Sequence, residues 1–371
     1  MKKRCTAPIL LAAAIAALVA ACTPHGALRP SAAPAPVAPA QAVVETGELE
    51  GAQYRIDLPA NWNGELIVNA HGYEPVGSPR ERPLGFPGGM APLLAEGFAI
   101  AASGYSAQGW AIPEAVADTE RLRAHFVARH GVPKRTWLVG WSMGGLVALA
   151  SAERYPRAYD GVVSMCGVGV SSEAAMATGT LAPVAAFDAL FPGVLPQAPG
   201  GLADPSLPAA PDGDAIEAAL SGNEARASTL ADHFDIARGD LAGSVWLYYV
   251  ALRELAQRAG GFPVDSATGA GGTEADEAAL GVRIRRYAAD PAALAYVRST
   301  GGLTGAAPVP VVLQPNAVDP IVTARLSRGY ASLAAGAGRA AQVRVLPGVG
   351  EGHCGFPGDT LGQALQRLRM P

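Results

Sequence analysis

The sequence predicts an α/β fold in which a mostly parallel sheet carries helices on both faces and an inserted, mainly helical cap. Strand-like and helix-like segments alternate along the chain after about residue 42, which is typical of parallel βαβ units. Several of the strands are apolar throughout, as strands covered on both faces must be. The alternation stops at about Ser171 and resumes at Val309, so the residues between them form an insertion.

The segments before the insertion, residues 42–170, form the first part of the predicted core. Arg55–Leu58 and Glu65–Ala70 are strand-like, and the tight turn at Asn61–Gly64 between them predicts a hairpin that opens the sheet. Apolar spacing, with Pro113 at one helix start, predicts the segments that follow. In chain order we expect a helix over 90–95, a strand over 98–102, a helix over 113–130, a strand over 136–139, a helix over 146–154 and a strand over 161–165.

The insertion, residues 171–308, is predicted to form the helical cap. Seven prolines between Leu181 and Asp214 predict loop rather than regular structure in its first part. Apolar residues at helical spacing follow, namely Leu241, Val245, Tyr248, Leu252 and Leu255, and then Leu280, Ile284 and Tyr287. The core resumes over residues 309–371, where we expect a strand over 309–313, a helix over 324–335, a strand over 342–346 and a final helix carrying Leu361, Ala364, Leu365 and Leu368.

The chain opens with the pattern of an export signal. Residues 1–21 carry three basic residues and then an apolar run. The run ends in Val19-Ala-Ala-Cys22, which resembles the lipobox of bacterial lipoproteins; this resemblance implies cleavage before Cys22 and lipid modification of its thiol. The alternative is an ordinary small-residue cleavage site. Residues 22–41 are rich in Ala and Pro and predict a tether. We therefore expect an exported protein anchored in the cell envelope, at the outer membrane or the cell surface.

Composition argues against several classes of partner. Without residues 1–21, Lys+Arg falls from 28 to 25 against 32 Asp+Glu, so the net charge is −7. Nucleic acid is bound through clustered basic surface, so we expect no nucleic-acid partner. No His-Glu-x-x-His or Cys-x-x-Cys pattern occurs, and the glycine-rich stretch at 85–89 lacks the lysine of a phosphate loop. We expect no metal and no cofactor.

The most informative motif is Leu-Val-Gly-Trp-Ser-Met-Gly-Gly over residues 138–145. It places a Gly-x-Ser-x-Gly turn between a predicted strand and a predicted helix, which is the layout of a nucleophile elbow. Side chains at Gly140 and Gly144 would clash in so sharp a turn, whereas glycine tolerates it. Ser142 is therefore the candidate nucleophile.

With this motif, the chain resembles the α/β-hydrolase superfamily from about residue 52 to residue 368, apart from the insertion. Members of that superfamily carry the nucleophile, the acid and the histidine in this chain order. Only His233 and His353 follow Ser142, and His233 falls inside the insertion. His353 follows the last predicted strand, so the resemblance implies that it is the general base.

The acid is predicted at Asp319. The strand over 309–313 leads into Asp-Pro-Ile-Val, which the superfamily often shows at the position of its acid, where the carboxylate orients the histidine. The alternative is that Asp319 only forms a turn before proline. In that case Glu173, at the start of the cap, is the substitute.

The resemblance also implies an oxyanion hole, and the positions of several aromatic residues suggest a substrate pocket. One donor is the backbone N–H of Met143 and the other that of Tyr73, with Gly72 allowing close approach. Pocket candidates, besides Tyr73, are Trp110, Trp246 and Tyr249. For the last two, packing within the cap is the competing interpretation.

The cysteines add a second resemblance. Cys354 adjoins His353, and a cysteine in this place is similar to tannases and feruloyl esterases, in which it pairs with a cysteine next to the serine. Here Trp141 occupies that position, so Cys166, at the end of a predicted strand, would be the partner. The alternative is a pair of unbonded buried thiols.

Together these features predict a serine hydrolase that cleaves a small-molecule carboxylic ester through an acyl-enzyme. One alternative is a peptidase acting on short peptides, although Glu217, Glu224 and Arg226 offer no charged cluster for a peptide terminus. The other is a non-catalytic surface lipoprotein that retains the fold.

Overall fold

The fold is seen in a computed structural model that describes residues 39, 41–80, 84–86, 89–267 and 272–370. The predicted signal peptide (1–21), Cys22 and the rest of the tether except residues 39 and 41 lie outside the described residues. No helix in the described ranges combines the length and the apolar character needed to cross a membrane.

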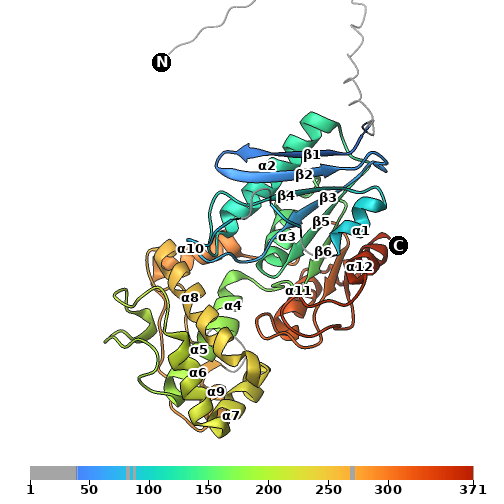
Figure 1. Cartoon of the computed structure of the whole chain (residues 1–371). Coiled ribbons are helices and arrows are strands. Elements are labelled where there is room, and N and C mark those ends of the chain that lie inside the picture. The colour runs from blue at the N-terminus through green and yellow to red at the C-terminus, as the bar shows by residue number, and fades with distance from the viewer. Residues whose placement is uncertain (1–38, 40, 81–83, 87–88, 268–271, 371) are drawn as a thin grey trace, which may run out of the picture. The chain divides into compact units, whose positions relative to one another are not determined.

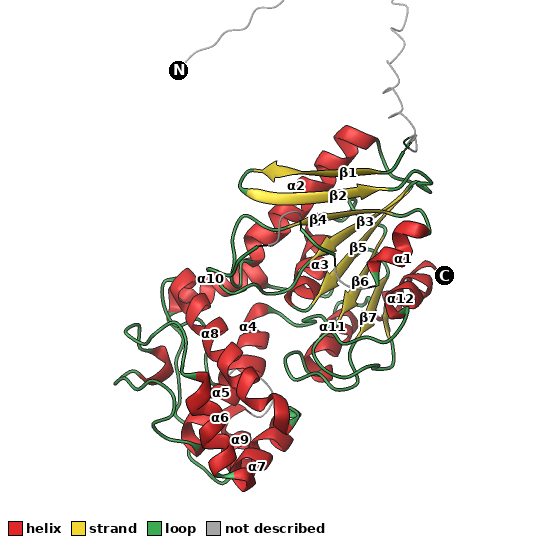
Figure 2. Ribbon diagram, in the orientation of Figure 1, coloured by secondary structure: helices red, strands yellow, loops and turns green. Residues whose placement is uncertain are grey.

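An eight-stranded sheet lies at the centre of the described chain (Figures 1 and 2), in the order β1-β2-β4-β3-β5-β6-β7-β8. Strands β3 to β8 are parallel to one another, whereas β2 pairs antiparallel with both β1 and β4. The prediction of a mostly parallel sheet is confirmed. The strands are β1 (Val43–Leu49), β2 (Ala52–Leu58), β3 (Glu65–Ala70), β4 (Ala99–Ser103), β5 (Arg135–Trp141), β6 (Gly161–Met165), β7 (Val311–Gln314) and β8 (Val343–Val345).

The predicted hairpin between β2 and β3 is wrong, because β4 lies between these two strands. The hairpin of the sheet instead joins β1 to β2 through Glu50 and Gly51, whose φ angles of 49° and 85° are those of a type I′ turn. Strand β1 is a largely exposed edge with little apolar content, so it left no clear signal in the sequence. Strand β3 is buried almost throughout and therefore needs a neighbour on each side.

Helices cover both faces of the sheet. The side chains of β3 alternate, so Ile67 packs with α1 and α12 on one face, while Leu66 and Val68 pack with α2, α3 and α11 on the other. The core helices are α1 (Met90–Ala95), α2 (Ile112–His130), α3 (Met143–Arg154), α11 (Ala324–Gly336) and α12 (Thr360–Arg369). The predicted core strands and helices are confirmed, with ends that move by at most three residues.

The insertion lies between β6 and β7 and is largely helical (Figure 2). Its α-helices are α4 (Ser172–Met176), α5 (Ala182–Leu190), α6 (Gly213–Gly222), α7 (Glu224–Phe234), α8 (Leu241–Ala259), α9 (Gly272–Leu280) and α10 (Pro291–Gly301). Shorter helical turns in the described chain are η1 (Ala177–Leu181), a π-helical turn, and η2 (Gly201–Ala203), η3 (Arg238–Asp240) and η4 (Ala340–Gln342). The predicted apolar face of α8, from Leu241 to Leu255, is buried as expected.

Two expectations for the cap are wrong. The proline-rich stretch begins with a helix, α5, rather than a loop, because Pro183 stands in the first turn, where a helix needs no backbone N–H. The second helical pattern is broken after Leu280, where α9 ends and Gly281 adopts φ 64°. Ile284 and Tyr287 are buried from irregular chain instead.

Candidate active site

Ser142 lies at the sharp turn between β5 and α3. Its backbone is left-handed, at φ 55° and ψ −124°, which is a strained conformation for a residue with a side chain. A Cβ at Gly140 would lie 2.0 Å from the Gly144 carbonyl oxygen, and a Cβ at Gly144 would lie 2.1 Å from that of Ala70. Both positions therefore require glycine, which explains the spacing of the motif.

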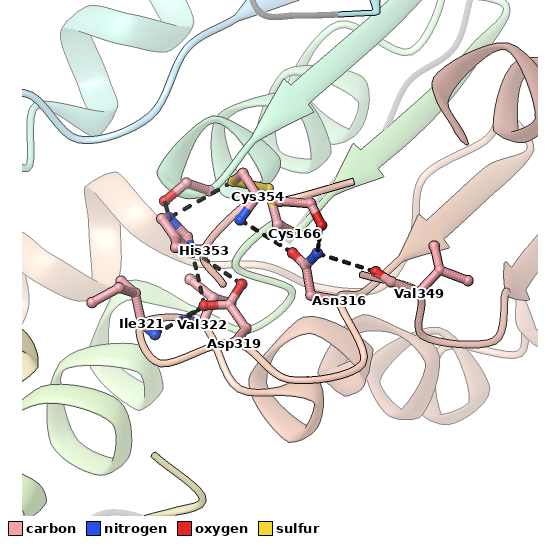
Figure 3. The surroundings of a disulfide bond; sticks show 10 residues. Cys166, Asn316, Asp319, Ile321, Val322, Val349, His353 and Cys354 are labelled. Carbon is pink, nitrogen blue, oxygen red and sulfur yellow. Dashed lines mark hydrogen bonds and ion pairs between the residues drawn. A yellow bond between two sulfur atoms is a disulfide. The ribbon is translucent and has the colours of Figure 1, made fainter. Parts of the chain in front are cut away.

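The structure brings Ser142, His353 and Asp319 into one hydrogen-bonded row. His353 Nε2 lies 2.8 Å from Ser142 Oγ, and His353 Nδ1 lies 2.9 and 3.0 Å from the two carboxylate oxygens of Asp319 (Figure 3). When Nδ1 donates to the carboxylate, Nε2 is left to accept the serine proton. Asp319 is buried and also accepts the backbone N–H groups of Ile321 and Val322, each at 2.9 Å.

The topology explains why residues so distant in the sequence meet. Ser142 follows β5, Asp319 follows β7 and His353 follows β8, and the carboxyl ends of parallel strands open onto the same edge of a sheet. Asn316, which the sequence analysis missed, ties the acid loop to the histidine loop. Its side-chain nitrogen donates to the carbonyls of Val349 and Gly355, and its side-chain oxygen accepts the N–H of Cys354 (Figure 3). No pattern in the sequence indicates that an asparagine in a loop will form these hydrogen bonds.

Cys166 and Cys354 form a disulfide bond, so the alternative of two unbonded thiols is wrong (Figure 3). Cys166 follows β6 directly, which attaches the histidine loop to the centre of the sheet. Both cysteines adopt left-handed backbone conformations, at φ 44° and 58°. Cys354 Sγ lies 3.8 Å from His353 Nε2, so the bond adjoins the imidazole ring itself.

The two predicted oxyanion donors flank Ser142. A Cβ at Gly72 would lie 3.1 Å from the Cβ of Ser142, which shows how closely the loop before Tyr73 crosses the serine. Met143 begins α3, so its N–H is one of the unpaired donors of a helix start. Within the part of the chain that the structure describes, neither the Met143 nor the Tyr73 N–H has a hydrogen-bond acceptor.

The side chain of His71 holds this loop. Its Nδ1 lies 2.8 Å from the Gly72 carbonyl oxygen and can donate to it. The ring stacks on Tyr105, whose hydroxyl donates to the His71 carbonyl at 3.1 Å. Burial lowers the pKa of His71 and favours the neutral ring. In a trans peptide the N–H points opposite to the C=O, so fixing the Gly72 carbonyl also fixes the direction of the Tyr73 N–H.

An apolar cavity of about 150 Å³ contains Ser142 and His353. Of the predicted pocket residues, Tyr73 and Trp110 line it, but Trp246 and Tyr249 do not. Tyr249 is buried in the cap, where its hydroxyl donates to Pro208, and Trp246 packs near Gly213. Successive helix residues turn by about 100°. The side of α8 opposite Trp246 and Tyr249 therefore carries Leu247, Tyr248 and Ala251, and these line the cavity.

The remaining candidates lie elsewhere. Glu173 forms an ion pair with Arg298 at 2.6 Å, so it is not the acid that contacts His353. His233 of the cap pairs with Asp276 at 2.8 Å. Across the described ranges, no three His, Cys, Asp or Glu side chains gather in a way that could hold a metal ion.

One family model matches part of the chain. A family model described as the alpha/beta hydrolase fold matches residues 77–212, a span that includes Ser142. No curated protein sequence matches the chain. The chain is similar to a solved esterase from Rhodococcus sp. ECU1013, at 15% identity over 89% of this chain and 97% of that one, with a TM-score of 0.42. It is also similar to a carboxyl esterase from Bacillus coagulans, at 14% identity over 83% and 90%, with a TM-score of 0.40. A third structure, 2-hydroxy-6-oxo-6-phenylhexa-2,4-dienoate hydrolase from Rhodococcus sp. strain RHA1, gives 16% identity over 88% and 98% and a TM-score of 0.42.

Proposed function

We propose that this chain, which has the α/β-hydrolase fold, is a serine hydrolase that cleaves a carboxylic ester through an acyl-enzyme. The observation that carries the proposal is the position of His353, which lies within hydrogen-bond distance of Ser142 Oγ on one side and of Asp319 on the other. A base oriented by a third group and in contact with a hydroxyl is the arrangement that activates a serine.

In the first half of the reaction, Ser142 Oγ forms a bond to the ester carbonyl carbon while His353 Nε2 takes its proton. The carbonyl oxygen becomes an oxyanion, and the backbone N–H groups of Met143 and Tyr73 donate to it. The carboxylate of Asp319 stabilises the imidazolium. The bond between the carbonyl carbon and the alkoxy oxygen then breaks, and His353 returns the proton to that oxygen. The products are an alcohol and the acylated serine.

In the second half, water takes the place of the alcohol. His353 Nε2 accepts a proton from the water as its oxygen bonds to the acyl carbon, and the same oxyanion donors act again. The bond to Ser142 Oγ breaks, and the serine recovers its proton from His353. The carboxylic acid leaves, so the net reaction is ester plus water to acid plus alcohol.

The lining of the cavity favours an uncharged substrate group. Apart from His353, no charged side chain lines it among the residues that the structure describes. The terminus of a short peptide carries a charge, which is costly to bury without a partner. These contacts therefore favour an ester with an apolar acyl group over a peptide.

A fluorophosphonate probe, which reacts with activated serines, tests the proposal. We expect the probe to label the wild-type protein and not the Ser142→Ala variant, while Ser299→Ala, which changes an exposed serine on α10, labels like wild type. Hydrolysis of nitrophenyl esters and of peptide anilides then separates esterase from peptidase. Equal labelling of wild type and Ser142→Ala, or no labelling at all, would contradict the enzyme and favour a non-catalytic protein.

We also propose that the protein is exported and anchored through a lipid on Cys22. The lipobox-like sequence before Cys22 supports this, and the Cys166–Cys354 disulfide suits an oxidising compartment outside the cytoplasm. Metabolic labelling with a fatty-acid analogue in a bacterial host should mark the wild-type chain and not Cys22→Ser. Labelling that persists in Cys22→Ser would rule out this anchor.

A further inference from the structure

A second cavity adjoins the candidate active site. It has a volume of about 340 Å³ and lies between the cap and the start of α11. Gly179, Tyr248 and Leu326 line both this cavity and the apolar cavity around Ser142, so the two cavities are neighbours. A substrate held at Ser142 that reaches past these shared residues would enter the second cavity.

The second cavity differs from the first in its chemistry. Besides Tyr248, six polar or charged residues line it, namely Thr178, His233, Asp235, Asp276, Thr323 and Arg325. Arg325 is an exposed residue at the rim of the cavity and forms no hydrogen bond or ion pair with any residue in the described part of the chain. Thr323 precedes α11, yet its hydroxyl caps none of the helix N–H groups. Donors are thus available toward the cavity without a partner in the protein.

The charges that line the second cavity limit the chemical class of ligand that it can bind. Arg325 can only donate hydrogen bonds, whereas the carboxylate of Asp235 can only accept them. Asp276, which also lines the cavity, is already bonded to His233. A carboxylate ligand could pair with Arg325 but would be repelled by Asp235 and Asp276, and an ammonium ligand would be repelled by Arg325. A hydroxyl group donates and accepts at once, so it satisfies both kinds of partner.

The position of the serine decides which half of the substrate lies where. The acyl group stays bonded to Ser142 Oγ, which belongs to the small apolar cavity. We propose that the second cavity binds the alcohol half of the ester and that this alcohol carries hydroxyl groups, as a polyol or a sugar does. The inference rests on the proposed ester hydrolysis and names its substrate class: a short apolar acyl group on a hydroxylated alcohol.

Three butyrate esters with different alcohol halves test this substrate class: glycerol monobutyrate, pentyl butyrate and the butyrate ester of 3-hydroxypropanoate. Replacing Arg325 by Met keeps the apolar stem and removes the donors. We expect Arg325→Met to raise the KM for the glycerol ester about tenfold relative to that for the pentyl ester, since a hydrogen bond to a charged group is lost. The matched control is Arg328→Met, an exposed arginine one turn further along α11, which should leave the KM ratio unchanged.

A binding measurement separates failure of this inference from failure of the proposed function. In the Ser142→Ala background, tryptophan fluorescence should report glycerol monobutyrate binding that Arg325→Met weakens about tenfold. If this holds but wild type hydrolyses no ester, the proposed function is wrong and the alcohol site stands. If esters are hydrolysed but Arg325→Met leaves the glycerol-to-pentyl ratio unchanged, the alcohol site is wrong. A loss confined to the 3-hydroxypropanoate ester would also overturn it, in favour of an anion site.

Discussion

At the scale of single residues, the buried side chain of His71 bonds to the backbone of Gly72, in the loop that crosses Ser142. Its Nδ1–H is directed at the Gly72 carbonyl, and its ring is held by Tyr105. An oxyanion donor at Tyr73 beside Gly72 was predicted from the sequence, but a local sequence pattern does not reveal where the imidazole ring of His71 points. In the structure the ring bonds to the Gly72 carbonyl and does not line the cavity around Ser142, so we expect it to act by positioning the Tyr73 N–H.

Removing the ring should therefore affect the transition state more than substrate binding. We expect His71→Ala to lower kcat by about 10- to 100-fold with a smaller change in KM, because a misdirected oxyanion donor is lost mainly when the charge develops. His71→Asn keeps a short side-chain donor and should recover part of the rate. Steady-state kinetics with a nitrophenyl ester measures both. Equal proportional changes in kcat and KM, or no recovery in His71→Asn, would contradict a positioning role.

The same residue predicts a pH effect on stability. Burial lowers the pKa of His71 in the folded state below its ordinary value of 6.5, so the unfolded chain binds the proton more readily. The free energy of unfolding should therefore decrease as the pH falls below about 6.5 and become constant below the folded-state pKa. His71→Gln cannot titrate and should flatten this part of the curve. Urea unfolding between pH 7 and 5 measures it, and identical slopes in the two proteins would refute the assignment.

At the scale of elements, the loops after the strands determine the site, and the disulfide controls one of them. It joins residues separated by 188 positions and attaches the histidine loop to the end of β6. Asn316 holds the same loop through hydrogen bonds from the acid side. Apart from β1, the core strands and helices were predicted to within three residues because their periodicity is local. The contacts between the loops were not predicted, because they depend on which strands lie next to one another in the sheet.

Loss of the disulfide should reduce both stability and rate. Replacing Cys166 and Cys354 together by Ala should lower the free energy of unfolding by roughly 5 kcal/mol in the chain-entropy model, because the closed loop is long. The rate should also fall, because His353 neighbours Cys354. Chemical unfolding and ester hydrolysis with and without dithiothreitol measure these effects. Reductant should weaken wild type but leave the double variant unchanged; a double variant that remains sensitive would contradict the explanation.

At the scale of the whole described chain, the cap is bonded to the core beside the cavity. Glu254 of α8 accepts the backbone N–H of Trp110 at 2.7 Å, and Arg258 donates to the Gln108 carbonyl at 2.7 Å and to Glu114 at 3.0 Å. Trp110 forms part of the cavity wall, and its indole N–H donates to Ser172 at the start of α4. The C-terminal half of α8 in the cap therefore positions Trp110, a core residue that lines the cavity.

Breaking this connection should disturb the pocket rather than the chemistry. We expect Glu254→Ala to raise KM about tenfold with a smaller change in kcat, and to lower the free energy of unfolding by about 1–3 kcal/mol, because a buried N–H and Arg258 lose a partner. Glu48→Ala, on the exposed edge strand β1, is the matched control and should behave like wild type. Kinetics and thermal unfolding measure both quantities. A fall in kcat with an unchanged KM would show that the cap contact does not act through the pocket.

The features that local chemistry imposes could be predicted from the sequence. The elbow at Ser142 follows from the clash that side chains at Gly140 and Gly144 would meet, and the core strands and helices follow from apolar periodicity. The chain order of Ser142, Asp319 and His353 was also readable. Which segments meet is seen only in the folded chain: β4 lies between β2 and β3, Asp319 rather than Glu173 contacts His353, Cys166 pairs with Cys354, and Tyr248 rather than Trp246 or Tyr249 lines the cavity. The physical reason is that these contacts join residues far apart in the chain, and their geometry depends on packing that no local pattern records.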